Sequence, residues 1–222
     1  MLARLRHLTR GRRGHAFRAF LRGFGRPLRI VDLGGTVSFW EGWGLTAADG
    51  LHVVLINNHV ADTSHRDETS RQEFLENRNR DATSLSREEL AAFDLIFSNS
   101  FLEHLGAPSV QADLARKIEA SGRPYFIQVP NKWSPIDPHF PRPYVPFFAT
   151  YPRGLQARLL TWDGLGSSGA SPSLAVAMKR LSHYVPLGRG DMRRLFPSAH
   201  LEVERPFGLP MSILAHRMAP AY

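Results

Sequence analysis

The sequence contains no cysteine, and lysine is rare, with only three lysines among 28 basic residues. Without cysteine, disulfides, thiolate zinc sites and a cysteine nucleophile are excluded, and His, Asp and Glu remain as metal ligands. No run of apolar residues approaches the roughly 20 that a membrane-spanning helix requires. A chain of 222 residues with 43% hydrophobic residues predicts one globular domain with a single core.

Acidic residues are missing from the start of the chain, where nine arginines precede Asp32. Leucines and phenylalanines recur at helical spacing between these arginines, whereas Gly11 and Gly14 predict a break into two short amphipathic helices. We interpret residues 1–28 as a basic amphipathic segment and residues 29–222 as the folded domain. The segment has four open roles: a partly frayed leader with two phenylalanines on the core, a docking segment over the active site, an anchor on an anionic membrane surface, or an organellar transit peptide, although the usual serine enrichment is missing.

The net charge of +8 would ordinarily favour a nucleic-acid partner, because clustered cations release counterions from phosphates. Here the excess charge is concentrated in residues 1–29, and the remainder of the chain is nearly balanced. This distribution disfavours nucleic acid. We expect a cytoplasmic protein, with peripheral membrane contact through the N-terminal segment as an alternative.

Short apolar runs alternate with helical patterns in the first 131 residues. Ser86, followed by Glu89 three residues later, is a capping-box pattern that predicts the start of a helix. Residues 111–122 predict an amphipathic helix that ends at Gly122. Strands that alternate with helices are typical of βαβ units and a parallel sheet. The predicted strands are residues 29–35, 51–57, 93–100 and 123–131.

The chain changes in character after the fourth predicted strand. Residues 132–172 are dense in proline, glycine and aromatic residues and show no regular period. A long irregular connection in a compact domain is usually a lid or a binding loop, so we interpret residues 132–190 as a lid or acceptor-binding insertion. Helices are predicted over residues 173–183 and from Gly190. Residues 200–217 predict two antiparallel strands at the sheet edge.

The turn after the first predicted strand is the candidate cofactor site, because parallel sheets bind ligands outside the carboxyl ends of their strands. Gly34 and Gly35 let the backbone turn sharply and approach a ligand. The Asp32 carboxylate can fix the loop amides or bind an ammonium group, and a tight turn without a ligand is the alternative. A dinucleotide fingerprint would need further glycines where Thr36 and Ser38 stand, so a pyrophosphate cradle is not expected.

Four segments resemble the class I S-adenosylmethionine-dependent methyltransferases, in particular the small-molecule group called type 11. They are D-L-G-G-T-V-S, the strand that ends in I-N-N, R-D-A-T-S-L and F-D-L-I-F-S-N-S-F-L-E-H-L. The resemblance covers residues 29–131 and implies S-adenosylmethionine as the cofactor. It also implies a Rossmann-like α/β fold, with a mostly parallel central sheet, helices on both faces and an antiparallel edge strand.

The resemblance implies that the cofactor lies along the carboxyl ends of the first two strands. The family's glycine motif is matched at Asp32 and Gly34, and Gly35 and Thr36 continue the turn. Asn57 stands where the family usually has an acid that binds both ribose hydroxyls. An amide there still donates and accepts, but one charge-assisted hydrogen bond is weakened.

Two further segments are given cofactor-binding roles by the same resemblance. Asp81 would accept a hydrogen bond from the adenine amino group, and Ala82 would donate one through its backbone. Asn99 and Ser100 would lie beside the methionine part of the cofactor.

The candidate catalytic bases are His104 and His139, because an unperturbed imidazole titrates near neutral pH. The resemblance places Glu103 and His104 at the floor of the active site. A base is required only if the acceptor is a hydroxyl or a protonated amine. His104 can alternatively be a hydrogen-bonded core residue and His139 part of the loop scaffold. Asp137 can orient His139 or share a metal with it, but two residues make an incomplete metal site, so no metal is expected.

Aromatic side chains surround these histidines in the sequence. They can form an acceptor wall suited to a planar, glycosidic or lipid-like molecule, or they can form the core of the lid. The set is Trp133, Tyr144, Phe147, Phe148, Tyr151 and Trp162.

The leading functional hypothesis is methyl transfer from S-adenosylmethionine to an oxygen, or less favourably a nitrogen, of a small molecule such as a saccharide or lipid-linked intermediate. One alternative is a methyltransferase-like binding protein that has lost catalysis, which the missing glycines and Asn57 motivate. The other is a nucleic-acid methyltransferase that uses the N-terminal arginines to grip phosphates. The sequence lacks an Asn-Pro-Pro-Tyr-type motif for flipped bases, which counts against this second alternative.

Overall fold

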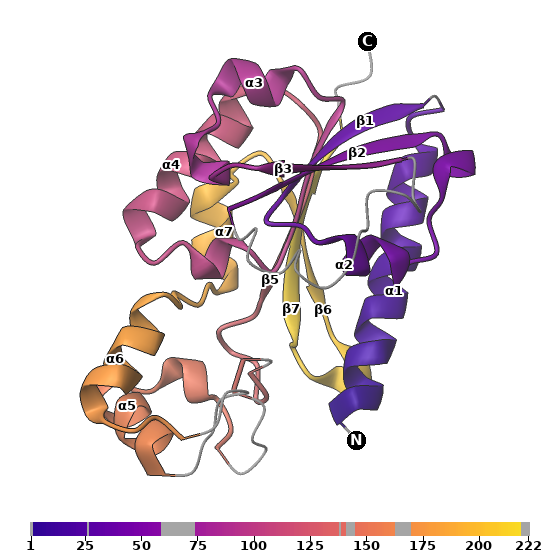
Figure 1. The fold of residues 1–222 in the computed structure, drawn as a ribbon. Helices are drawn as coiled ribbons and strands as arrows, with labels where there is room; N and C mark the ends of the chain where they lie inside the picture. Colours follow the sequence, from indigo (N-terminus) through magenta and orange to yellow (C-terminus); the bar gives the residue numbers. More distant parts are fainter. Residues whose placement is uncertain are drawn as a thin grey trace.

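A computed structural model describes residues 2–25, 27–58, 74–137, 139–140, 145–162 and 170–218, with side chains from residue 11 onward apart from Arg12. At its centre lies one seven-stranded sheet with the order β3-β2-β1-β4-β5-β7-β6 (Figure 1). The strands are β1 (Leu28–Leu33), β2 (Leu51–Asn57), β3 (Leu75–Asn79), β4 (Leu95–Asn99), β5 (Tyr125–Pro130), β6 (His200–Glu204) and β7 (Ser212–Arg217).

The sheet is parallel from β3 to β5, and β7 lies antiparallel between β5 and β6. The predicted parallel sheet and the antiparallel pair at its edge are therefore confirmed. Strands β1, β2 and β4 are buried on both faces, as expected for strands that helices cover on either side.

β3 is the strand that the sequence pattern did not predict. It occupies the edge of the sheet, and its polar residues after Leu75 are mostly exposed. An edge strand has a single neighbour, so polar residues suffice and no alternating apolar pattern arises. Its place is set by parallel pairing with β2, which brings Asn79 beside Asn57.

Helices cover both faces of the sheet, as predicted (Figure 1). One face carries α3, α4 and α7, whose Leu90, Leu114 and Met192 pack in a single cluster with the sheet. The other face carries α1 and α2. The helices are α1 (Leu2–Arg22), α2 (Val37–Glu41), α3 (Arg87–Ala91), α4 (Pro108–Ala120), α5 (Arg153–Trp162), α6 (Leu174–Ser182) and α7 (Arg189–Leu195), and 3-10 turns span Ala47–Asp49, Ala82–Ser84, Leu102–His104, Phe148–Thr150 and Pro206–Gly208.

α1 is one continuous helix, so the predicted break at Gly11 and Gly14 is wrong. A methyl group added at Gly14 would lie 3.4 Å from the Trp43 indole, an ordinary van der Waals contact, so this side of the helix faces that ring. Phe17 is completely buried and lies edge-on to Phe97, with ring centroids 4.9 Å apart. The second half of α1 therefore packs on the sheet as part of the core.

The predicted helix start at Ser86 is confirmed. Its hydroxyl accepts a hydrogen bond from the Glu89 amide at 3.1 Å, and the Glu89 carboxylate accepts one from the Ser86 amide at 2.8 Å. α4 ends where Gly122 adopts a φ of +70°, a left-handed conformation that favours glycine.

The segment after β5 contains a small core of its own. α5 lies inside residues 132–172, for which no regular structure was predicted, and this prediction is wrong over α5. The prediction of a helix at residues 173–183 is confirmed by α6. Together α5 and α6 project beyond the carboxyl end of β5 (Figure 1). Their shared core consists of Phe140, Phe148, Ala157, Leu160, Ala177, Leu181 and Tyr184.

Across the described residues, none of the helices combines the length and the apolar character needed to cross a membrane.

Candidate cofactor pocket and histidine cluster

A pocket of about 190 Å³ lies at the carboxyl ends of β1 and β4. These two strands are neighbours in the sheet, and the chain adds strands in opposite directions on their two sides. Open parallel sheets bind their ligands at such a switch point. Five residues predicted from the sequence, Asp32, Gly34, Gly35, Thr36 and Asn99, line it. The complete lining among the described residues is Asp32, Gly34, Gly35, Thr36, Ser38, Phe39 and Asn99.

The two glycines of the turn are required by their surroundings. Gly34 has a φ of +79°, and a methyl group there would lie 2.2 Å from the Phe101 ring. A methyl group on Gly35 would lie 1.9 Å from the Asp32 carboxylate. A larger residue would thus displace Phe101 beside the turn or the Asp32 wall of the pocket, which explains the glycine pair without a complete family motif.

Asp32 is buried, and one of its oxygens accepts a hydrogen bond from the Trp40 indole at 2.7 Å. Its other oxygen, Oδ1, is buried without a hydrogen-bond partner among the described residues. Burial raises the pKa of Asp32 to about 7, and the bond from Trp40 opposes this shift. A buried carboxylate with one uncompensated oxygen at a pocket wall is suited to a ligand with an ammonium group, such as the amino acid part of S-adenosylmethionine.

Asn57 and Asn99 border the same turn from neighbouring strands. The Asn57 side chain donates to the Gly35 carbonyl at 3.4 Å, which holds the turn against β2. Asn99 accepts a 2.6 Å hydrogen bond from Arg13. Arg13 also pairs with Glu204 at 2.8 Å, so α1 is anchored at the pocket by a buried guanidinium. Arg13 was not predicted from the sequence, because one arginine among nine in that segment carries no distinguishing pattern.

Asn57, Ser100, Asp81 and Ala82, which were also predicted to bind the cofactor, do not belong to the described lining of the pocket. Ser100 has a φ of +55° and donates to Gln128 at 3.0 Å, so its backbone turns the chain out of β4. The Asp81 carboxylate accepts from the Thr83 amide and hydroxyl, both at 2.8 Å, and Ala82 is buried beside it. This turn follows β3, and its adenine-binding role remains a prediction.

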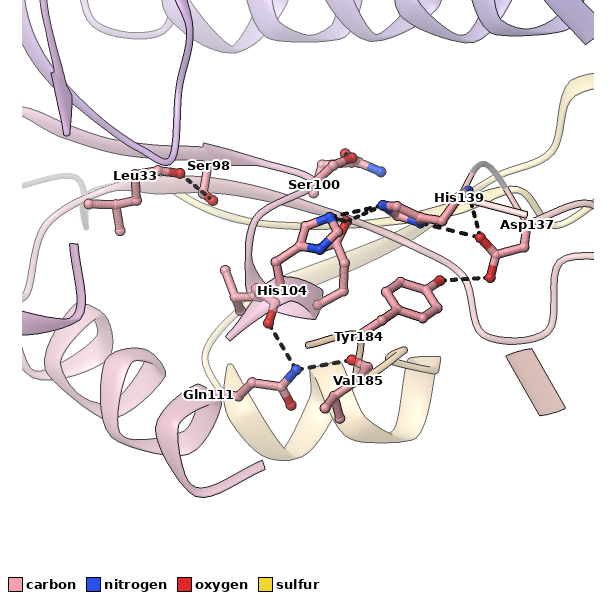
Figure 2. Close-up of polar contacts among 12 residues, drawn as sticks. Leu33, Ser98, Ser100, His104, Gln111, Asp137, His139, Tyr184 and Val185 are labelled. Atoms are coloured by element: carbon pink, nitrogen blue, oxygen red, sulfur yellow. Dashed lines mark hydrogen bonds and ion pairs between the residues drawn. The ribbon is translucent and has the colours of Figure 1, made fainter. Parts of the chain in front are cut away.

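His104 and His139, predicted separately, are brought into contact, with their Nε2 atoms 2.9 Å apart (Figure 2). His104 ends the 3-10 turn after β4, and His139 lies in the loop after β5. The His139 Nδ1 lies 3.2 Å from the Asp137 carboxylate, which also accepts from the His139 amide and, at 2.8 Å, from the Tyr184 hydroxyl. Asp137 therefore orients His139, as the sequence allowed.

Glu103 lies beneath the two imidazoles. Its side chain is fully buried, and neither carboxylate oxygen has a hydrogen-bond partner in the described part of the chain. Oε1 lies 3.9 Å from the Nε2 of His104 and 4.0 Å from that of His139. Burial raises the pKa of Glu103 to about 7, with His139 opposing the shift. Burial and the neighbouring His139 lower the pKa of His104 to about 4, so His104 is neutral near pH 7.

The aromatic residues of this region divide between the two predicted fates. Phe148 is buried in the core of α5 and α6, whereas Trp133 and Trp162 are 58% and 82% exposed. Phe147 is also exposed, Tyr151 is half-buried, and Tyr144 lies outside the described residues.

The strand order, with an antiparallel strand inserted next to the edge, and the pocket at the β1–β4 switch point define the class I methyltransferase fold. The solved structures that match the chain include several S-adenosylmethionine-dependent methyltransferases. No protein-family model and no curated protein sequence matches it.

Three of these structures illustrate the likeness. A methyltransferase from Mesorhizobium loti is 15% identical with a TM-score of 0.55, and the match covers 90% of this chain and 96% of that one. An Archaeoglobus fulgidus methyltransferase is 12% identical with a TM-score of 0.53, and the match covers 94% of each chain. Human N-acetylserotonin methyltransferase, solved in complex with S-adenosylmethionine, is 14% identical with a TM-score of 0.51, covering 86% of this chain and 47% of that one. Identities this low establish the fold alone.

Proposed function

We propose that the chain binds S-adenosylmethionine in the pocket at β1 and β4 and transfers its methyl group to an oxygen of a small molecule. The observation that carries the proposal is the buried Asp32 oxygen without a partner among the described residues, on a side chain that lines a pocket at the switch point of a methyltransferase fold. A cationic amino acid group is the ligand chemistry that such an oxygen favours.

S-adenosylmethionine supplies a methyl group already activated on a sulfonium. The protein then has to align the acceptor, which can account for much of the rate enhancement, and to remove the acceptor's proton. Because Asp137 accepts from the Nδ1 of His139, the Nε2 of His139 faces His104. The pair can take up one proton, and the carboxylates of Asp137 and Glu103 would stabilise the resulting charge.

This pair favours oxygen over nitrogen as the attacked atom. A hydroxyl must lose its proton during transfer, whereas a neutral amine can attack with its lone pair and lose a proton later. The exposed indoles of Trp133 and Trp162 offer flat surfaces on which a sugar ring or planar acceptor can stack. We therefore propose a saccharide or a lipid-linked intermediate as the acceptor, with residues 132–190 as its binding region.

Cofactor binding is tested by isothermal titration with S-adenosylmethionine and S-adenosylhomocysteine. Asp32→Asn should weaken S-adenosylmethionine binding by about tenfold or more, because it removes a charge-assisted hydrogen bond. Asp113→Asn, at an exposed position on α4, is the matched control and should leave affinity unchanged. No binding of either ligand to the wild-type chain would refute the proposal.

Transfer is tested by incubation with radiolabelled S-adenosylmethionine and a fractionated cell extract. Label in a saccharide or lipid fraction would support the proposed acceptor. Cofactor binding without transfer to any fraction would favour a binding protein that has lost catalysis. Label in nucleic acid would favour the remaining alternative.

A further inference from the structure

We infer that Glu103, His104 and His139 bind a divalent transition-metal ion of the zinc class. The two imidazole nitrogens and a Glu103 oxygen all lie within 4.8 Å of one another. Two histidines and one carboxylate are a ligand set that protein zinc and iron sites use. No metal was expected from the sequence, because only Asp137 stands beside His139 along the chain.

The separations suit a single ion. In a tetrahedral site with metal–ligand bonds near 2.1 Å, two ligand atoms lie about 3.4 Å apart. The separations here are 2.9 Å between the imidazole nitrogens and 3.9 and 4.0 Å from each to Glu103, which bracket that value. A shift of the carboxylate by about half an ångström would bring both nitrogen–oxygen separations near that value, and the imidazole nitrogens would have to move apart by about the same amount.

Glu103 supplies an independent indication of a cation. Both its oxygens are buried without a hydrogen-bond partner among the described residues. A carboxylate withdrawn from water at this cost requires a compensating charge or a proton. An ion held between the imidazoles would supply that charge at the side of Glu103 that faces them.

Asp137 and Tyr184 prepare His139 to act as a ligand. Asp137 accepts from Nδ1, so the lone pair of the neutral ring lies on Nε2, the atom that faces His104 and Glu103. The Tyr184 hydroxyl in turn holds Asp137 (Figure 2). Carboxylates that fix a metal-bound histidine in this way are a regular part of zinc sites.

The site is open on one side. The side chain of His104 is 42% exposed and that of His139 is 25% exposed, while Glu103 closes the opposite side. Three protein ligands and an accessible fourth position are the arrangement of zinc sites that bind water or a substrate oxygen. Imidazoles occupied by a metal cannot take up a proton, so metal binding and the base role proposed above are alternative uses of the pair.

A second group of the same residue types provides an internal comparison. His200 and Glu202 are exposed on β6, His216 is partly buried on β7, and the Glu202 side chain is 52% exposed. Solvent stabilises the Glu202 carboxylate, so this group carries no indication of a missing cation.

The experiment titrates the full chain, freed of metal with a chelator, with Co²⁺ as an optical probe and then with Zn²⁺ in competition. The wild type should bind one ion that gives a visible cobalt absorption band and raises the melting temperature. His104→Ala, His139→Ala and Glu103→Gln should each weaken binding by about 100-fold or more, and Asp137→Asn by roughly 10- to 100-fold. His216→Ala is the matched control and should leave this ion in place.

Three outcomes would overturn the inference: no ion bound by the wild type, binding that survives His104→Ala and His139→Ala, or binding that only His216→Ala removes. Circular dichroism of each variant shows whether it is folded, and the half-exposed His104 provides a substitution that the fold tolerates. The titration contains no S-adenosylmethionine, so its failure and the failure of the proposed function are distinguishable.

Discussion

Two buried carboxyl groups lie near the carboxyl ends of β1 and β4, and they are held differently. Asp32 has one oxygen fixed by Trp40 and the other unpartnered within the described structure. Glu103 has neither oxygen engaged and faces imidazoles from two segments of the chain. Burial raises the pKa of both to about 7. A carboxylate fixed at one oxygen favours a single ligand geometry, whereas one held at neither oxygen can rotate towards an approaching charge.

The largest effect that separates the two centres is expected from His139→Ala. Removal of the imidazole should lower kcat by about 10²- to 10⁴-fold, the usual contribution of a positioned base. S-adenosylhomocysteine affinity should be unchanged, because His139 does not line the described cofactor pocket. Initial rates together with calorimetry measure both quantities. His183→Ala, at an exposed position after α6, is the control. A loss of cofactor affinity in His139→Ala would mean that the Asp32 pocket and the histidine pair act as a single site.

The buried Asp32 predicts a stability that falls as pH rises. Between about pH 3.8 and 7 the folded protein retains a proton on Asp32 that the unfolded chain has released, so the free energy of unfolding decreases through that window and levels off above it. The decrease attributable to Asp32 is at most about 4 kcal/mol, from roughly three pKa units.

Asp32→Asn should remove this component. Urea unfolding at pH 4 and at pH 8 should show equal stability for variant and wild type at the lower pH and a more stable variant at the higher pH. Identical pH profiles for the two proteins would show that Asp32 is solvated.

Gly35→Ala should affect the Asp32 centre alone. The new methyl group would lie 1.9 Å from the Asp32 carboxylate, and displacement of that wall should weaken cofactor binding by about 100-fold, or 2.7 kcal/mol. Metal affinity at Glu103 should be retained. Gly154→Ala, which has open space around it in α5, is the control and should stabilise the helix by up to about 1 kcal/mol. Undiminished cofactor affinity in Gly35→Ala would contradict the tight packing of this turn.

The smallest expected effect is that of Tyr184→Phe. It removes the hydrogen bond to Asp137 without changing the packing of the ring, at a cost of about 0.5–1.5 kcal/mol in the free energy of unfolding. Because Asp137 would orient His139 less firmly, metal affinity should fall by roughly tenfold. Unfolding curves and the cobalt titration measure the two effects, and an unchanged cobalt affinity would mean that Tyr184 has no part in orienting His139.

Local sequence patterns predicted those parts of the fold that local energetics determine. The apolar runs of β1, β2, β4 and β5 bury residues on both faces, so their signal is strong. β3 was missed because an exposed edge strand requires no apolar residues. α1 was predicted as two helices because glycine disfavours a helix locally, whereas the burial of Phe17 against Phe97 is a tertiary contact that local patterns do not report.

The candidate site was predictable to the extent that its residues are adjacent in the sequence. Asp32, Gly34 and Gly35 form a single turn, and they all line the pocket. His104 and His139 were each predicted from their own segment, but the 2.9 Å contact between them depends on the path of the loop after β5. Tyr184 comes from still further along the chain, and no local pattern marks it.

The contacts of Arg13 join α1 to β6 and β7, which are synthesised much later than α1. Arg13 is bonded to Glu204 and Ser212, and 191 positions separate it from the first of these. Protein chains are synthesised from the N-terminus at about 5–20 residues per second. α1 therefore emerges among the first elements but cannot complete its contacts until β6 and β7 have been made. The contacts of Arg13 with Glu204 and Ser212, which hold α1 beside Asn99, are thus among the last of the described contacts to form.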